Sequence, residues 1–224
     1  MKDTALLLID PLNDFLAEGG KLWPYAKDVI HRLGMLDNLR NLLGTARAAG
    51  ITVVFVPHRR YEPGTFTSWK FLNPTHAGVV RIESFLRGSW GAEFHPDFTP
   101  RAGELVASEH WLHSGFMNTD LDLQLRMHGI DRIVIAGMRT NACVEATARW
   151  GVELGYHVTL AKDATAAFSI EEWQATIEVN ARTYAHSVAT SEEIVARWAS
   201  AAATPQIAPS QCAIGSGVSM VATG

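Results

Sequence analysis

Short apolar runs alternate with segments of helical periodicity along most of this chain. The runs, among them TALLLI and ITVVFV, lie at residues 4–9, 51–56, 104–108, 132–137, 157–164 and 187–190. TALLLI at residues 4–9 is a short continuous apolar run, which is typical of a strand that is buried on both faces of a sheet. Apolar residues at helical spacing occur at residues 29–50, 120–129, 142–155, 170–185 and 191–203. The alternation predicts a doubly wound, Rossmann-like α/β fold, in which a mostly parallel sheet carries helices on both faces.

The stretch between the second and third runs interrupts this alternation. Residues 57–103 are rich in Pro, Gly and aromatic residues and are too long for a plain connection, so we expect lids or binding loops there. Neither an internal repeat nor an interdomain linker is visible, and residues 1–204 are predicted to form a single domain. Residues 205–224, PQIAPSQCAIGSGVSMVATG, are predicted to be a tail that is flexible or packs on a neighbouring subunit.

Charge and cysteine content argue against several classes of partner. The net charge is −4 with no long basic run, so neither nucleic acid nor an anionic membrane is expected as a partner. No apolar run approaches the about 20 residues of a membrane span, and Asp10 interrupts the first run too early for a signal peptide. The two cysteines, Cys143 and Cys212, form no CxxC motif and no disulfide framework. We therefore expect a protein of the reducing cytoplasm.

Reactive side chains follow the predicted strands at their carboxyl ends. Asp10 ends the first, Glu109 and His110 end the third, and the fourth leads through GMRTNA to Cys143. Ligands of open α/β sheets bind at this edge, so the fold predicts one site that contains these groups. Cys143 also begins a predicted helix, whose free N–H groups and dipole favour a thiolate and an oxyanion. The alternatives are a small buried cysteine that fills the core and an aspartate that caps the turn at Pro11.

Three segments resemble the isochorismatase-like cysteine hydrolases, which include nicotinamidases, carbamoylsarcosine amidohydrolases, and biuret and ureidoacrylate hydrolases. They are LLLIDPLNDFL, SGFMNTDLDLQL and IAGMRTNACVEATARWGVELGYHVTLAKDA, and together the likeness covers most of residues 4–190. The resemblance implies that Asp10 is the general base and that Cys143 is the nucleophile, with a thioester intermediate. It also implies a cis peptide between Met138 and Arg139, which aims the N–H of Arg139, with that of Cys143, at the oxyanion.

The catalytic pattern departs from that family at one position. The family has a lysine four residues before its S-x-F segment, and here Ser114 and Phe116 put His110 at that place. Lysine keeps a fixed charge, whereas the charge of a histidine with an ordinary pKa near ~6.5 depends on its surroundings. We expect His110 to orient Asp10, to stabilise the thiolate or to donate a proton, with Glu109 holding the imidazole. The alternative is a hydrogen-bonded histidine at a strand end.

The segment VPHRRYEPGTF after the second strand bears on metal and substrate binding. Nicotinamidases carry a metal site here, built from an Asp and histidines, but this segment has His58 without an Asp, so we expect no metal and no other cofactor. Arg59 or Arg60 is a candidate to clamp a substrate carboxylate or carbonyl, although solvated surface arginines are an equal alternative. The residues predicted to line the substrate pocket are Phe15, His58, Arg60, Trp69, Lys70, Trp90, Glu109, Trp111 and His113.

These observations predict a cysteine hydrolase that cleaves a C–N bond of a small amide, ureide or related molecule through a thioester. Asp10, His110 and Cys143 are its predicted catalytic residues. One alternative is hydrolysis of a vinyl ether on the same fold, as in isochorismatase itself, with the aspartate as acid and no thioester. Another is a degenerate relative that only binds a small molecule or another subunit. The resemblance and the apolar character of the tail also predict a homo-oligomer.

Overall fold

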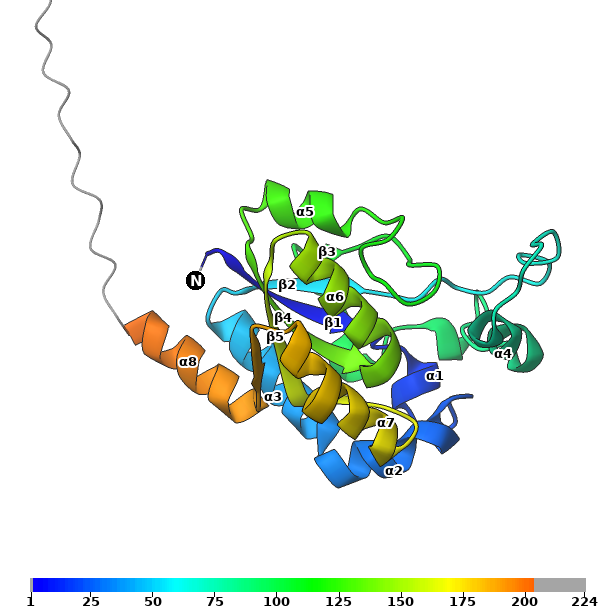
Figure 1. Cartoon of the computed structure of the whole chain (residues 1–224), viewed down its shortest axis with the longest axis horizontal. Coiled ribbons are helices and arrows are strands. Elements are labelled where there is room, and N and C mark those ends of the chain that lie inside the picture. The colour runs from blue at the N-terminus through cyan, green and yellow to red at the C-terminus, as the bar shows by residue number, and fades with distance from the viewer. Residues whose placement is uncertain (1, 204–224) are drawn as a thin grey trace, which may run out of the picture.

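The computed structural model describes residues 2–203 and contains a six-stranded sheet in the order β3-β2-β1-β4-β5-β6 (Figure 1). Its strands are β1 Thr4–Ile9, β2 Thr52–Val56, β3 Leu105–Val106, β4 Arg132–Met138, β5 His157–Ala166 and β6 Ser187–Ala189. Every neighbouring pair is parallel, so the predicted doubly wound fold is confirmed. The strand order reverses between β1 and β4, which puts the topological switch point of the sheet beside the end of β1.

Helices cover both faces of the sheet. They are α1 Asn13–Leu16, α2 Trp23–Leu33, α3 Met35–Ala48, α4 Pro74–Ile82, α5 Leu121–Met127, α6 Glu145–Glu153, α7 Ile170–Gln174 and α8 Ser191–Ala203. One hydrophobic cluster joins the sheet to α2, α3 and α8, and a second joins the opposite face to α5 and α6. Both faces are therefore removed from water, as a parallel sheet requires.

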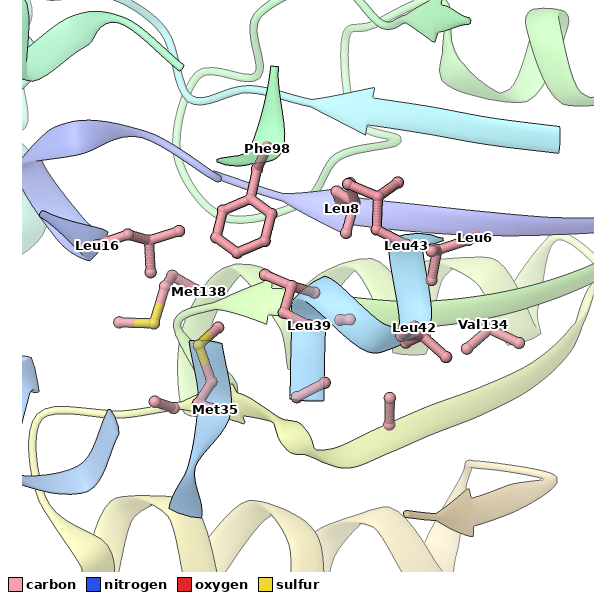
Figure 2. Packing of buried hydrophobic residues seen from close by; sticks show 14 of the residues in the cluster. Leu6, Leu8, Leu16, Met35, Leu39, Leu42, Leu43, Phe98, Val134 and Met138 are labelled. Atoms are coloured by element: carbon pink, nitrogen blue, oxygen red, sulfur yellow. The ribbon is translucent and has the colours of Figure 1, made fainter. Parts of the chain in front are cut away.

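The unbroken apolar sequence of β1 follows from this arrangement. Successive side chains of a strand point to opposite faces. Leu6 and Leu8 belong to the first cluster, where Figure 2 shows them close to Leu43 of α3, whereas Leu7 and Ile9 belong to the second. All of β1 is buried, so a polar residue at any of these positions would need a partner inside the core.

Two segments differ from the sequence prediction. The helix expected at residues 29–50 is a pair, α2 and α3, because Gly34 adopts a left-handed conformation with φ 61° and ends α2. The stretch 57–103, expected to be irregular, contains α4, which begins with Asn73 as a side-chain cap and Pro74 in its first turn. In Figure 1, α4 lies beyond the carboxyl ends of the strands, at the same end of the sheet as α1.

The predicted tail at residues 205–224, with Cys212, lies outside the described residues, so its packing and its link to a homo-oligomer remain predictions. Between residues 2 and 203, no helix combines the length and the apolar character needed to cross a membrane.

Candidate active site

Asp10, His110 and Cys143 come together at the switch point. Asp10 directly follows β1, His110 follows β3, and Cys143 lies in the turn Thr140–Val144 between β4 and α6. One ligand atom of each lies within 4.8 Å of the other two, and all three side chains are buried. The structure thus places side by side the three residues that the sequence predicts to be catalytic, although they are up to 133 positions apart (143 − 10).

Gly137 brings the turn of Cys143 close to Asp10. A Cβ at this position would lie 2.1 Å from the carbonyl oxygen of Ile9, and the φ of Gly137 is +114°. Only glycine tolerates both constraints. Any other residue at position 137 would force β4 away from the end of β1. Asp10 itself has a φ of 50°, and its N–H donates to the carbonyl of Val56 at 3.0 Å.

The carboxylate of Asp10 and the imidazole of His110 form a buried pair. His110 Nε2 lies 2.8 Å from Asp10 Oδ1, and both side chains are 0% exposed. Burial alone would raise the pKa of Asp10, but the charge and hydrogen bond of His110 outweigh it and hold that pKa below its ordinary value. Asp10 is therefore an anion at neutral pH, and its second oxygen, Oδ2, accepts no hydrogen bond from a nitrogen or hydroxyl donor in the described residues.

The thiol of Cys143 differs from the sequence prediction. Its position at a helix start predicts a lowered pKa, whereas the structure raises it well above the ordinary value. Burial is the largest cause, followed by the negative charge of Asp10 and a hydrogen bond to it. The resting thiol therefore keeps its proton. It donates to the carbonyl oxygen of Leu112 at 3.7 Å and lies within 4.8 Å of the ionised carboxylate of Asp10.

The backbone ahead of Cys143 has the geometry that the resemblance implies. The peptide bond between Met138 and Arg139 is cis. The N–H of Arg139 hydrogen-bonds the sulfur of Cys143 and lowers its pKa, though less than burial and Asp10 raise it. An N–H that hydrogen-bonds the sulfur also lies near the carbonyl carbon that the sulfur would attack. It is therefore placed to donate to the oxyanion that forms on that carbonyl.

A cavity of about 330 Å³ opens beside Cys143. Of the nine predicted pocket residues, Phe15, His58 and His113 line it. Phe85 and Phe168, which sequence reasoning missed, complete its aromatic wall: the ring centroids of Phe15 and Phe85 are 5.1 Å apart, and those of Phe15 and Phe168 are 6.4 Å apart. Phe168 follows the DA of the nucleophile segment by four residues, which is a usable signal, whereas nothing in the sequence marks Phe85.

His58 is one polar group of this cavity. Its Nδ1 lies 2.8 Å from the carbonyl of Arg59, so Nδ1 carries the hydrogen and Nε2 is left as an acceptor. Burial, and then the charge of His110, lower the pKa of His58 to about 4, so this imidazole is neutral at pH 7. A neutral acceptor next to the nucleophile suits an N–H donor of a bound molecule.

Six predicted pocket residues do not line the cavity: Arg60, Trp69, Lys70, Trp90, Glu109 and Trp111. Arg60 donates to the carbonyl of Ala92 and pairs with Glu109 at 3.2 Å, so Glu109 holds arginines rather than the imidazole of His110. The Arg59 guanidinium lies 3.8 Å from the ring centre of Trp111, on which it stacks. Neither arginine after β2 lines the cavity beside Cys143.

The remaining three lie at the surface. Trp69 is 39% exposed and Trp90 49% exposed, and the ammonium of Lys70 lies over the ring of Phe71. Trp69 packs with Phe66 and His76 at the outer side of α4. Their place in a segment rich in aromatic residues suggested a pocket, but that segment forms its own small core.

The donor set near His58 does not fit a metal. His58 Nδ1 is occupied by a backbone carbonyl, and the next two residues are arginines. In residues 2–203, three or more potential His, Cys, Asp or Glu ligands gather only at Asp10, His110 and Cys143, and His58 is not among them. That no metal serves this protein stays a prediction.

Asp14 holds one wall of the cavity in place. Its buried carboxylate accepts the N–H of Lys21 at 2.9 Å and that of Phe85 at 2.5 Å. We expect Asp14→Ala to lower the free energy of unfolding by about 2–4 kcal/mol, because both N–H groups lose their acceptor. Urea denaturation measures this. The control Asp37→Ala, whose side chain is 86% exposed, should change stability by less than about 0.5 kcal/mol, and an equal loss in both variants would contradict the role of Asp14.

The chain is similar to known proteins in sequence and in fold. The family described as Isochorismatase domain matches residues 4–193. The ureidoacrylate amidohydrolase RutB of Variovorax paradoxus is 30% identical over 212 residues, which cover 90% of this chain and 83% of that protein. A cysteine hydrolase from Pseudomonas syringae is similar in structure, with a TM-score of 0.75 and 26% identity over 89% of this chain and 94% of that one. The N-carbamoylsarcosine amidase from Thermoplasma acidophilum has a TM-score of 0.64 and 28% identity over 85% and 97% of the two chains.

Proposed function

The chain belongs to the isochorismatase family of hydrolases, and we propose that it is a cysteine hydrolase that cleaves a C–N bond of a small amide or ureide. One observation carries this proposal: the carboxylate of Asp10, with one oxygen free of nitrogen and hydroxyl donors in the described residues, lies within 4.8 Å of the protonated thiol of Cys143, in a buried site that opens to a cavity. Such a pair transfers a proton when the sulfur attacks, so the base and the nucleophile are both ready at neutral pH. The amidohydrolase names of two of the relatives support the choice of bond.

The reaction begins with attack of Cys143 Sγ on the carbonyl carbon, while the thiol proton passes to Asp10. The negative charge that develops on the carbonyl oxygen is stabilised by the N–H groups of Arg139 and Cys143. Protonated Asp10 then donates to the leaving nitrogen, the C–N bond breaks and a thioester remains. Water opens the thioester with Asp10 again as base, which frees the acid and restores the thiol.

His110 acts on Asp10 rather than on the substrate. Its hydrogen bond fixes the carboxylate, and its influence keeps the pKa of Asp10 low despite complete burial. Asp10 also has to return its proton to the leaving nitrogen, and a strong carboxylic acid does so readily. The histidine thus replaces the fixed charge of the family lysine as a positioning and electrostatic group.

The proposal is tested with a panel of small amides and ureides, including N-carbamoylsarcosine, ureidoacrylate and nicotinamide, assayed for released ammonia or amine. We expect turnover of at least one of them, and rapid quenching should reveal an acyl adduct on the peptide that contains Cys143. Turnover without any adduct, unaffected by blocking Cys143, would contradict the thioester route. Hydrolysis of isochorismate alone would favour the vinyl ether reaction, and an inert thiol with no turnover would indicate a binding protein.

A change at Asp10 separates the base from the nucleophile. Asp10→Asn should lower kcat/KM by about 10²–10⁴-fold, because the thiol loses its proton acceptor. The same change should lower the pKa of Cys143, since the charge of Asp10 is one of the causes that raise it. Thiolate absorbance near 240 nm, followed against pH, measures that shift. A thiol that ionises more easily yet reacts more slowly with substrate identifies Asp10 as the base, whereas an unchanged rate would contradict it.

A further inference from the structure

The side chain of Arg139 faces the cavity, whereas its backbone N–H serves the sulfur. Arg139 lines the cavity together with Cys143 and Phe168, and its guanidinium lies 3.9 Å from the ring centre of Phe168. Burial and Asp10 raise the pKa of Cys143, and the positive charge of Arg139 opposes that rise; burial lowers the pKa of His113, which lines the same cavity, and the charge of Arg139 adds to that lowering. The guanidinium therefore acts electrostatically on two groups that line the cavity.

This guanidinium has no complete partner in the described part of the chain. The nearest carboxylate oxygen, Glu172 Oε2, is 3.6 Å away and already accepts the N–H of Phe168 at 3.1 Å. The amide oxygen of Asn141 lies 3.4 Å from the guanidinium, a long hydrogen bond. The Nε of Arg139 is buried and donates to nothing in residues 2–203. Arginine normally forms two parallel hydrogen bonds with a carboxylate, so a binding position for an anion is left open.

The rest of the cavity favours the same charge. Among the described residues that line it, two are arginines, Arg81 of α4 and Arg139, and none is Asp or Glu. His58 is neutral at pH 7 because its pKa is lowered to about 4. The carboxylate of Asp10 is held by His110 behind Cys143 and does not line the cavity. A bound anion would therefore meet positive charge and aromatic walls.

We propose that Arg139 is a specificity residue, and that the substrate carries a carboxylate that its guanidinium binds. This inference rests on the proposed function and names the substrate class of that site: amides or ureides that are also carboxylic acids. Because one residue supplies both the oxyanion N–H and the guanidinium, the scissile carbonyl and the carboxylate of the substrate are separated by no more than the reach of one arginine side chain. Arg59 and Arg60 do not line the cavity, so of these three arginines only Arg139 is placed for this role.

The test compares two alkylating reagents of nearly equal size, anionic iodoacetate and neutral iodoacetamide, on Cys143 of the full chain at mildly alkaline pH. Mass spectrometry of the Cys143 peptide gives the two rates, and their ratio reports the anion preference. We expect Arg139→Met to lower the iodoacetate-to-iodoacetamide ratio at least about tenfold, as for a lost charge-assisted hydrogen bond, and Arg139→Lys to restore part of it. Glu172→Gln should raise the ratio, because it removes the competing carboxylate.

The matched control is Arg126→Met on α5, whose side chain is 55% exposed and pairs with Asp122 outside the cavity. It should leave the ratio unchanged. A ratio that stays constant in Arg139→Met and Glu172→Gln would overturn the proposal, as would a cavity that neither reagent enters. If Arg139→Met does not fold, Arg139→Lys and Glu172→Gln still give opposite expectations, a partly lowered ratio and a raised one.

Alkylation requires no turnover, so it separates this inference from the proposed function. A charge-dependent ratio in a protein that hydrolyses no amide would leave Arg139 as an anion site and reject the hydrolase.

If turnover is found, N-carbamoylglycine and propylurea extend the test, because both carry a urea group and only the first is an acid. Arg139→Met should lower the ratio of their kcat/KM values at least about tenfold. An unchanged ratio would reject Arg139 as the specificity residue and leave the hydrolase standing.

Discussion

Replacing Cys143 by alanine should lower kcat on any amide or ureide substrate by on the order of 10⁴-fold or more. Without the sulfur no thioester forms, and the residual rate is limited to what a bound water can achieve in the same cavity. The loss is as large as for removal of a nucleophile in other hydrolases, because the nucleophile and its base act as one unit. Initial rates of ammonia or amine release, measured at enzyme concentrations high enough to detect slow turnover, give the value.

Two further variants make this result specific. Cys143→Ser replaces the thiol by a hydroxyl, which is a much weaker acid for Asp10 to deprotonate. This variant should therefore also be nearly inactive. Cys212→Ser changes the other cysteine of the chain and should retain wild-type turnover. Circular dichroism and urea unfolding confirm that the Cys143 variants are folded. An alanine variant that keeps more than a few per cent of the wild-type rate would contradict the thioester mechanism.

The sheet could be predicted from sequence because its strands carry an unusually clear pattern. Leu6, Leu7 and Leu8 are apolar in succession, which is typical of a strand covered on both faces. The break at Gly34 was missed because apolar residues continue at helical spacing on both sides of it. The helix α4 was missed because Pro and Gly are common around it, although Asn73 before Pro74 is a usable start signal.

The catalytic residues could be predicted from their positions at strand ends, but the cavity could not. Asp10 and Cys143 follow the neighbouring strands β1 and β4, so the topology alone brings them together. The wall residues Phe15, Phe85 and Phe168 come from three segments far apart in the chain, and their meeting depends on loop contacts such as the hydrogen bonds of Asp14. No periodicity encodes such contacts.

The pKa of Cys143 shows a second limit of sequence reasoning. The helix start favours a thiolate, and that influence is present as the N–H of Arg139. Complete burial and the charge of Asp10 oppose it and are larger, but neither is visible in the local sequence. The direction of a pKa shift depends on which of these contributions is greatest, so it requires the three-dimensional surroundings.

His110→Ala should lower kcat/KM by about 10²-fold or more, in line with the loss of a positioned group that supports the base. In the wild type, burial acts to raise the pKa of Asp10, and His110 reverses this. Without the imidazole, burial prevails and the pKa of Asp10 rises. Since the anion is the working base, the acid side of the activity profile should move to higher pH in the alanine variant. Measuring kcat/KM against pH shows the shift directly.

The same pair makes stability depend on pH in a defined direction. The folded-state pKa of Asp10 lies below its unfolded value of about 3.9, so its contribution is fully present above that pH and is lost as pH falls through the folded pKa. In His110→Ala the carboxylate stays buried without a charged partner. Removal of one member of a buried ion pair lowers the free energy of unfolding by about 3–5 kcal/mol. This loss should be largest at neutral pH, where Asp10 is an anion, and should shrink under mildly acidic conditions that protonate it.

His110→Lys is the decisive companion variant, because it restores a positive group at the position where the family has a lysine. It should recover part of the lost kcat/KM and bring the acid side of the profile back toward that of the wild type. It also protects the experiment if the alanine variant is too unstable to assay. His128→Ala, a change of an exposed histidine at the carboxyl end of α5, should alter neither rate nor profile. A wild-type rate and an unchanged profile in His110→Ala would mean that the imidazole does not set the pKa of Asp10. Arg139, whose charge acts on the thiol, would then be the next residue to replace.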